Sequence, residues 1–159
     1  MSMTESYLTI LESSLDKKIE LLDSIEMLNT EQEKILSAAA FDEEAFNHIV
    51  EQKAELVEKL NAMDEGFQLV YSNVKAELDG NREIYAAEIK RLQGKITQVM
   101  EKSSHLMAEE QRNKDRVTAK FASRRKEISS VKKNQQYAAN YYKTMNKVTS
   151  EPVFMDKKK

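Results

Sequence analysis

Hydrophobic residues recur three and four positions apart along most of the chain. This spacing is typical of helices that pack lengthwise on one another. Two interruptions, near residues 37–42 and 79–81, divide the pattern. The segments between them predict helices over about residues 4–40, 43–78 and 81–133. Because short connections favour antiparallel neighbours, we expect the three helices to run up, down and up.

The first interruption carries clear signals for the start of a helix. Asp42 is a preferred N-cap residue and is followed by two glutamates, whose charge suits the helix dipole. Phe41 and Phe46 have the spacing of a hydrophobic staple. These signals predict that the second helix begins at residue 43.

The predictions of the other two helix starts each depend on a single candidate cap residue. The first helix is expected to begin near Thr4, which offers a plausible cap. At the second interruption, Gly80 can adopt the left-handed conformation that ends a helix, and Asn81 can cap the next one.

The third predicted helix is about 53 residues long and exceeds each of the first two by roughly 15, which at about 1.5 Å per residue is an overhang of about 20 Å. Its apolar stripe becomes sparse beyond Leu106, where Glu110 and Asn113 occupy the next two positions of the pattern. An overhanging helix with so few apolar residues has little to bury by itself. We therefore expect it to pack on another chain, or to be frayed when the chain is alone.

Polar residues also interrupt the apolar stripes of the first two helices. Lys18, Asn29 and Gln32 lie on or beside the first stripe, and Lys53 interrupts the second. For the three residues of the first stripe, the favoured interpretation is that their stems pack while their polar heads reach solvent. The alternative is that they fix the register of the helices, as polar seam residues do in coiled coils.

The segment after residue 133 has a different character. It carries Tyr137, Tyr141, Tyr142 and Met145. Of these, Tyr137 and Tyr141 with Met145 (or Tyr142) could line one face of a short helix. Tyrosine and methionine are favoured at protein interfaces. We expect residues 134–159 to be a loosely held partner-binding tail; the alternative is that it folds back on the bundle.

Composition agrees with long helices. The 159 residues include three glycines, one proline and no cysteine, and 33% of them are charged. No stretch approaches the roughly 20 apolar residues of a membrane span, and no secretory signal is evident. These features predict a cytoplasmic, all-α protein without membrane insertion.

Charge is distributed unevenly along the chain. Residues 1–111 carry 11 Lys/Arg and 23 Asp/Glu, whereas residues 112–159 carry 14 and 4. The basic last third could lie against acidic helices of the same chain, or it could meet an acidic partner. A protein partner is favoured over nucleic acid, because the basic run at residues 124–126 has no accompanying nucleic-acid motif.

The sequence contains no recognisable catalytic constellation, phosphate-binding loop or cofactor motif. His48 and His105 lie on separate predicted helices, and we interpret them as ordinary polar residues rather than metal ligands. The chain is therefore predicted to be neither an enzyme nor a metalloprotein.

With these features, the chain resembles the flagellar type III export chaperones of the FlgN type. The similarity lies in the first helical arm at residues 7–22, in the long third helix and in the tail segments 141–145 and 154–158. The second arm contributes a pattern of four residues: Lys53, Leu56, Val57 and Leu60.

The resemblance implies an elongated antiparallel helical bundle that carries unfolded hook-associated proteins. Such a chaperone would bind the helical ends of these hook–filament junction proteins, prevent premature assembly and deliver them to the export gate or export ATPase complex. The cargo contacts it implies are the apolar positions of the matching segment: Val117, Phe121, Ile128, Val131, Tyr137, Tyr141, Tyr142 and Met145. The alternative is a structural coiled-coil adaptor or homodimeric spacer, in which the overhang pairs with its own copy.

Overall fold

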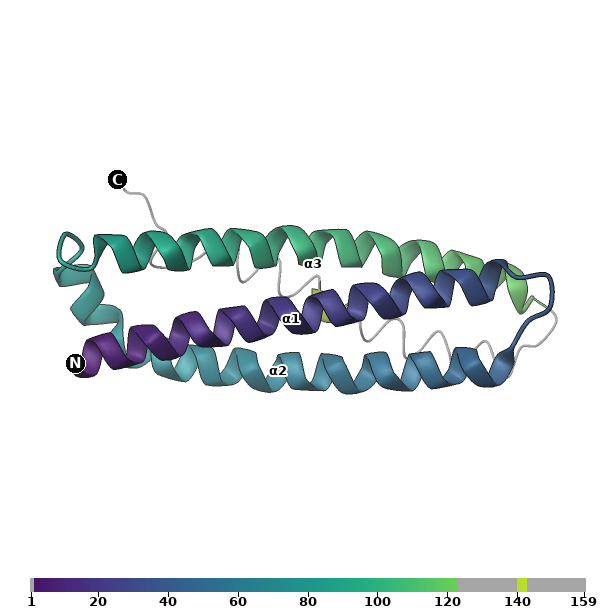
Figure 1. Ribbon diagram of the computed structural model, residues 1–159, viewed down its shortest axis with the longest axis horizontal. Helices are drawn as coiled ribbons and strands as arrows, with labels where there is room; N and C mark the ends of the chain where they lie inside the picture. The colour runs from purple at the N-terminus through teal and green to yellow at the C-terminus, as the bar shows by residue number, and fades with distance from the viewer. Residues whose placement is uncertain (1, 123–139, 143–159) are drawn as a thin grey trace.

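A computed structural model of the protein describes residues 2–122 and 140–142. Three long helices, α1 (Met3–Ser37), α2 (Glu43–Gly80) and α3 (Ala86–Lys120), make up nearly all of this part. They run antiparallel in succession and form an elongated bundle (Figure 1). The predicted all-α, antiparallel three-helix architecture is confirmed.

The first helix begins slightly earlier than predicted. Ser2, and not Thr4, is the N-cap: its Oγ accepts a hydrogen bond from Glu5 N at 3.1 Å. Glu5 Oε1 in turn accepts from Ser2 N at 2.9 Å, which completes a capping box. The serine–glutamate spacing satisfies two otherwise unpaired backbone donors at once, and a cap at Thr4 would leave them free.

The connection between α1 and α2 follows the prediction. Asp42 caps α2 by accepting a hydrogen bond from Ala45 N at 3.0 Å. The rings of Phe41 and Phe46 lie 5.6 Å apart between centroids, as expected for a hydrophobic staple.

The connection between α2 and α3 differs from the prediction. Asn81 belongs to α2: it is the C-cap residue, and its Nδ2 donates to Glu77 O at 2.9 Å. Residues 81–85 form turns, and α3 begins only at Ala86. Among the described residues no glycine has a positive φ, so the left-handed conformation expected at Gly80 is absent there. The reversal needs several residues because α2 and α3 lie apart.

The predicted overhang of the third helix is wrong. α3 is capped at Phe121 and has 35 residues, the same number as α1. The helix stops at the end of the bundle because Val117 and Phe121 are buried there with Leu36, Phe46 and Val50. The later part of the expected helix, residues 123–133, lies outside the described residues.

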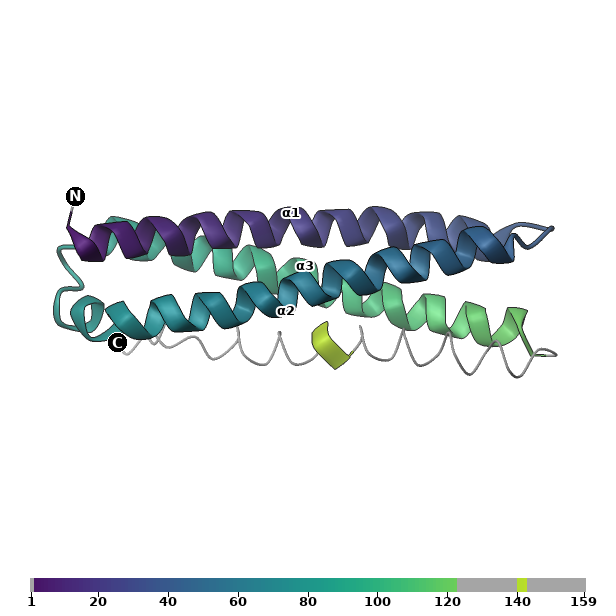
Figure 2. The same cartoon turned by 90° about the horizontal axis from the view of Figure 1, so that it is seen from below.

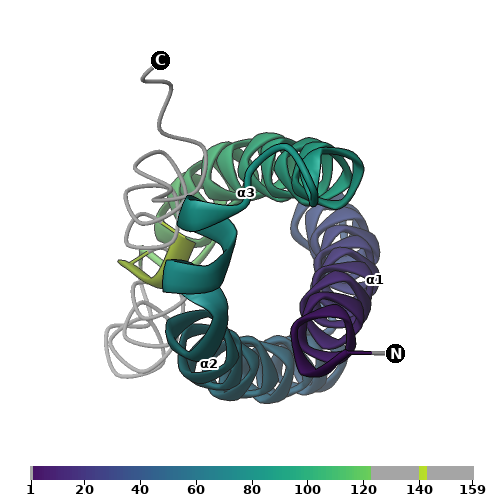
Figure 3. The same cartoon turned by 90° about the vertical axis from the view of Figure 1, so that its left-hand side faces the viewer.

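α1 packs along both of the other helices, whereas α2 and α3 have few close backbone contacts with each other. Seen end-on, the three helices therefore leave one side between α2 and α3 that α1 does not cover (Figure 3). α1 and α3 run parallel, and several ion pairs join them at a recurring offset of 79 residues, as in Lys95–Asp16 and Lys102–Asp23. This offset fixes which residues of α1 and α3 face each other.

Along α1 and α3 the buried positions alternate three and four residues apart, as in a coiled coil. The main hydrophobic core fills most of the bundle, and a separate end cluster closes it beside the α1–α2 connection. We call this second group the end cluster, and its members are Ile35, Leu36, Phe41, Phe46, Val50, Val117 and Phe121. In the part of the chain that is described, no helix combines the length and apolar character needed to cross a bilayer.

Candidate functional site

The side of the bundle between α2 and α3 is occupied by residues 140–142, a short helical piece of the C-terminal segment (Figure 2). Tyr141 and Tyr142 are 8% and 0% exposed and belong to the main hydrophobic core. Their rings meet edge to face with centroids 5.5 Å apart. We call these two residues the tyrosine pair. It lies where a fourth helix would complete a four-helix bundle.

Tyr141 is held by a carboxylate of α2. Its hydroxyl donates to Asp64 Oδ2 at 2.9 Å, and the other oxygen of Asp64 pairs with the ammonium of Lys18 on α1. Asp64 therefore joins α1, α2 and the C-terminal segment. Burial, followed by the negative charge of Asp64, raises the pKa of Tyr141 above its ordinary value.

Tyr142 faces α3 instead. Its hydroxyl is buried and has no hydrogen-bond partner among the described residues. Burial raises the pKa of Tyr142, and the nearby carboxylates of Glu110 and Glu109 raise it further. One oxygen of Glu110, Oε2, is also buried without a partner in the described part of the chain. Tyr142 thus places an unsatisfied hydroxyl beside an acidic part of the interior.

That acidic part belongs to a buried polar layer made by all three helices. Lys53 Nζ donates to Glu110 Oε1 at 2.7 Å and to Gln32 Oε1 at 3.0 Å. Asn113 Nδ2 donates to Gln32 Oε1 at 3.1 Å and to the carbonyl of Asn29 at 3.3 Å. These five side chains, the buried polar layer, separate the main core from the end cluster.

The favoured interpretation of the polar seam residues is wrong. Lys18, Asn29 and Gln32 do not extend their heads to solvent, since each is at most 7% exposed. They pair with polar residues of the other helices, which is the arrangement that the register-fixing alternative requires. Burial lowers the pKa of Lys53, and the carboxylate of Glu110 opposes that shift.

The structure separates the eight predicted cargo contacts. Val117 and Phe121 lie in the end cluster, where the Phe121 ring meets Phe41 edge to face at 4.6 Å. Tyr141 and Tyr142 lie at the other location, between α2 and α3. The remaining four fall outside the described residues: Ile128, Val131, Tyr137 and Met145.

The tyrosine pair supports the alternative in which the C-terminal segment folds back on the bundle. Asp64 and Glu110, which flank the pair, did not appear among the predicted site residues. The available signal was their spacing, because both occupy positions of the three-and-four repeat on their helices. The repeat alone does not indicate which polar seam residues contact a returning segment.

The first residues of the basic region make electrostatic contacts with α1 and its C-cap residue. Arg116 Nη2 lies 3.4 Å from Glu33 Oε2, and Lys120 Nζ donates to the carbonyl of Ala38 at 2.9 Å. The beginning of the basic region therefore lies against the chain's own α1.

Within the described residues, one group of side chains could hold a metal ion, and it consists of Glu26, His105 and Glu109.

Comparison with known proteins agrees with the architecture. The family described as FlgN protein matches residues 1–148, which is nearly the whole chain. A search of curated proteins and a search of solved structures each found no match. Because the match covers both the helical body and the tyrosine pair, the chain belongs to the FlgN family, a family of flagellar export chaperones.

Proposed function

We propose that this protein is a cytoplasmic chaperone that binds the amphipathic helical ends of hook–filament junction proteins. It keeps these ends from assembling prematurely and delivers the proteins to the type III export apparatus, through the export gate or the export ATPase complex. The observation that supports this proposal most directly is the tyrosine pair buried between α2 and α3.

The side of the bundle between α2 and α3 has the properties that an amphipathic helix needs. Three helices bury their apolar faces on one another but leave a fourth place, and residues 140–142 occupy part of it in helical form. A helix that lays its apolar face between two other helices follows a common mode of peptide recognition. A helical end of a cargo protein would displace residues 140–142 from this place and use the released tyrosine pair as its aromatic anchor.

The eight predicted residues remain the proposed cargo contacts. The described ones differ in which part of the structure must move before they can reach cargo. Tyr141 and Tyr142 are 8% and 0% exposed, so they would reach cargo only if residues 140–142 moved away from α2 and α3. Val117 and Phe121 are at most 2% exposed, so they would reach cargo only if the end cluster opened. The tyrosine pair is the better candidate for the first contact, because the buried Tyr142 hydroxyl has no partner among the described residues and opposes docking, whereas the end cluster is apolar.

Capture of junction proteins by purified chain tests the proposal. We expect Tyr141→Ala/Tyr142→Ala to weaken binding at least about tenfold, the loss expected when interface anchors are truncated. Tyr85→Ala is the matched control, since Tyr85 is a half-buried tyrosine packed against the same core at the start of α3. Unchanged or tighter binding by the double variant would overturn the assignment of these tyrosines, and failure of the wild-type chain to bind would overturn the function.

The adaptor alternative loses the feature that motivated it. It required an overhang of the third helix, yet in the described part of the chain α3 ends with the bundle and its last apolar residues are covered. Sedimentation of the full chain addresses this alternative directly, because a homodimeric spacer requires a stable dimer.

A further inference from the structure

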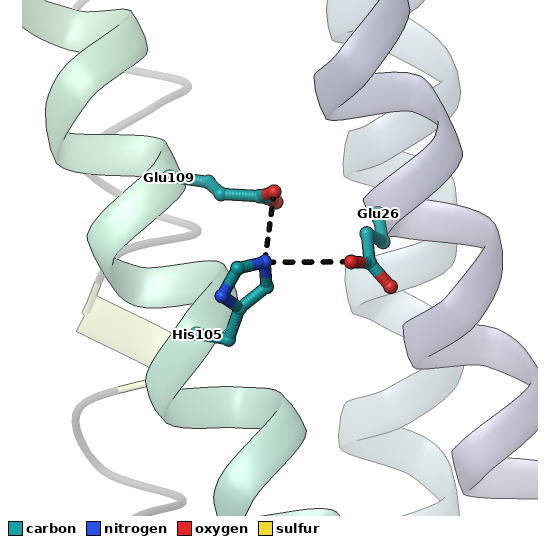
Figure 4. A group of neighbouring side chains, drawn as sticks. All are labelled: Glu26, His105 and Glu109. Atoms are coloured by element: carbon teal, nitrogen blue, oxygen red, sulfur yellow. Dashed lines mark ion pairs between the residues drawn. The ribbon is translucent and has the colours of Figure 1, made fainter.

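Three side chains with metal-ligating groups meet on the outer face of the α1–α3 interface (Figure 4). His105 Nε2 lies 3.4 Å from Glu26 Oε2 and 3.1 Å from Glu109 Oε2. Glu26 comes from α1, and the other two come from α3. The three candidate ligand atoms all lie within 4.8 Å of one another.

The sequence places these residues together for two reasons. His105 and Glu109 are four residues apart, so they lie on the same face of α3. Glu26 lies opposite His105 because α1 and α3 share the offset of 79 residues that also pairs Lys102 with Asp23. Neither helix carries the complete group, which is why the spacing on one helix alone did not indicate a metal site.

The two separations that involve His105 fit the first coordination shell of zinc. Zn²⁺ bonds to histidine nitrogen and carboxylate oxygen at about 2.0–2.2 Å, so two ligands of a tetrahedral site lie roughly 3.3–3.5 Å apart. The observed separations of 3.1 and 3.4 Å are close to this spacing. A neutral histidine and two carboxylates would also compensate the charge of a divalent ion.

One ligand is oriented by the protein interior. Asn29, which is 2% exposed, donates from Nδ2 to Glu109 Oε1 at 3.0 Å. This bond leaves Glu109 Oε2 directed toward His105. Outer-shell hydrogen bonds of this kind hold ligating carboxylates in place at metal sites. Because Asn29 is part of the buried polar layer, the surface group is anchored to the core.

We infer that Glu26, His105 and Glu109 bind a divalent transition-metal ion, with Zn²⁺ as the preferred probe, and that the ion clamps α1 to α3. The mixed nitrogen and oxygen donor set favours zinc, nickel or cobalt over calcium and magnesium, which prefer all-oxygen sites. With His105 and Glu26 largely exposed, the fourth position would face solvent. This property does not depend on cargo binding.

Calorimetric titration of ZnCl₂ into the untagged, chelator-treated full chain at about pH 7.5, where an ordinary histidine is neutral, tests the site. We expect one ion per chain, with Kd raised at least about tenfold by His105→Ala, as expected for loss of a ligand. Glu109→Gln should weaken binding in the same direction. His48→Ala is the matched control, because His48 is the only other histidine and is exposed on α2.

Thermal unfolding supplies a second readout that does not depend on the heat of binding. At zinc concentrations about 100 times Kd, the wild-type Tm should rise by roughly 5–10 °C. His105→Ala should abolish this shift while keeping the metal-free Tm, since the side chain is exposed. Zinc binding that survives His105→Ala, or that disappears with His48→Ala, would overturn the inference, as would the absence of binding by the wild-type chain.

Discussion

The pair formed by Lys53 and Glu110 offers the sharpest test of how the interior is organised. The side chains are 5% and 0% exposed, and the ammonium and carboxylate are 2.7 Å apart. We consider Lys53→Met, which keeps the length of the stem and removes the charge. The substitution would leave Glu110 buried without its cation, and Gln32 would keep only the hydrogen bond from Asn113.

The expected effect follows from desolvation. Breaking a buried ion pair by removing one partner costs about 3–5 kcal/mol, because the remaining charge has no compensation. Removing both partners avoids that penalty, so Lys53→Met/Glu110→Met should cost far less than the two single substitutions added together. We expect a coupling free energy of about 3 kcal/mol between the two positions, at the upper end of values for residues in contact.

The bundle contains a matched exposed pair. Lys102 and Asp23 are also 2.7 Å apart, but their side chains are 30% and 50% exposed. Exposed pairs contribute only about 0.2–1 kcal/mol. The same double-mutant cycle at these positions should therefore give a coupling several times smaller, although the distance is the same.

Urea unfolding of each full-length variant, followed by far-ultraviolet circular dichroism, measures these free energies. The slope m should stay constant within each cycle, because otherwise the denatured state has changed as well. A cost below about 1 kcal/mol for Lys53→Met, or additive single substitutions, would show that the layer is hydrated and that burial does not control its energetics.

Three further predictions concern the tyrosine pair and the first helix. Tyr141→Phe should cost about 1.5–3 kcal/mol in urea unfolding because it removes a hydrogen bond to the Asp64 carboxylate. Tyr142→Phe should instead stabilise the protein, since that buried hydroxyl has no partner among the described residues; equal costs would contradict the geometry. The pKa values of both tyrosines are raised in the folded state, so their contribution to stability is complete below about pH 10 and is lost as the pH rises further. Wild-type stability should therefore fall more steeply above about pH 10 than that of Tyr141→Phe/Tyr142→Phe, and parallel curves would refute the assignment. Ser2→Ala should cost about 1 kcal/mol through loss of the N-cap, measurable by thermal unfolding, whereas Thr4→Ala should have little effect.

The elements that depend on local chemistry were predictable. The cap at Asp42 and the staple of Phe41 on Phe46 involve residues within one turn, so the sequence contains all the information that their geometry needs. The apolar repeat likewise identifies the buried face of each helix without knowledge of its partner. These features account for the correct architecture and for most of the core.

The predictions that were wrong concern features that depend on partners far away in the chain. Gln32 and Lys53 look like interruptions when each helix is read alone, and only the three-dimensional register shows that they satisfy one another. The end of α3 was misplaced for the same reason. The apolar repeat continues beyond Val117, but the aromatic residues that cover Phe121 come from the α1–α2 connection and the first turns of α2.

The buried polar layer and the tyrosine pair are connected through Glu110. This carboxylate holds Lys53 with one oxygen, and its negative charge raises the pKa of Tyr142. The apolar body of the Tyr142 ring favours the docked segment, whereas its unpartnered hydroxyl opposes docking by losing hydration without a replacement bond in the described part of the chain. A segment docked with such an internal penalty is easier to displace than a fully satisfied one. In the proposed chaperone, the side between α2 and α3 would therefore stay covered without becoming closed to a cargo helix.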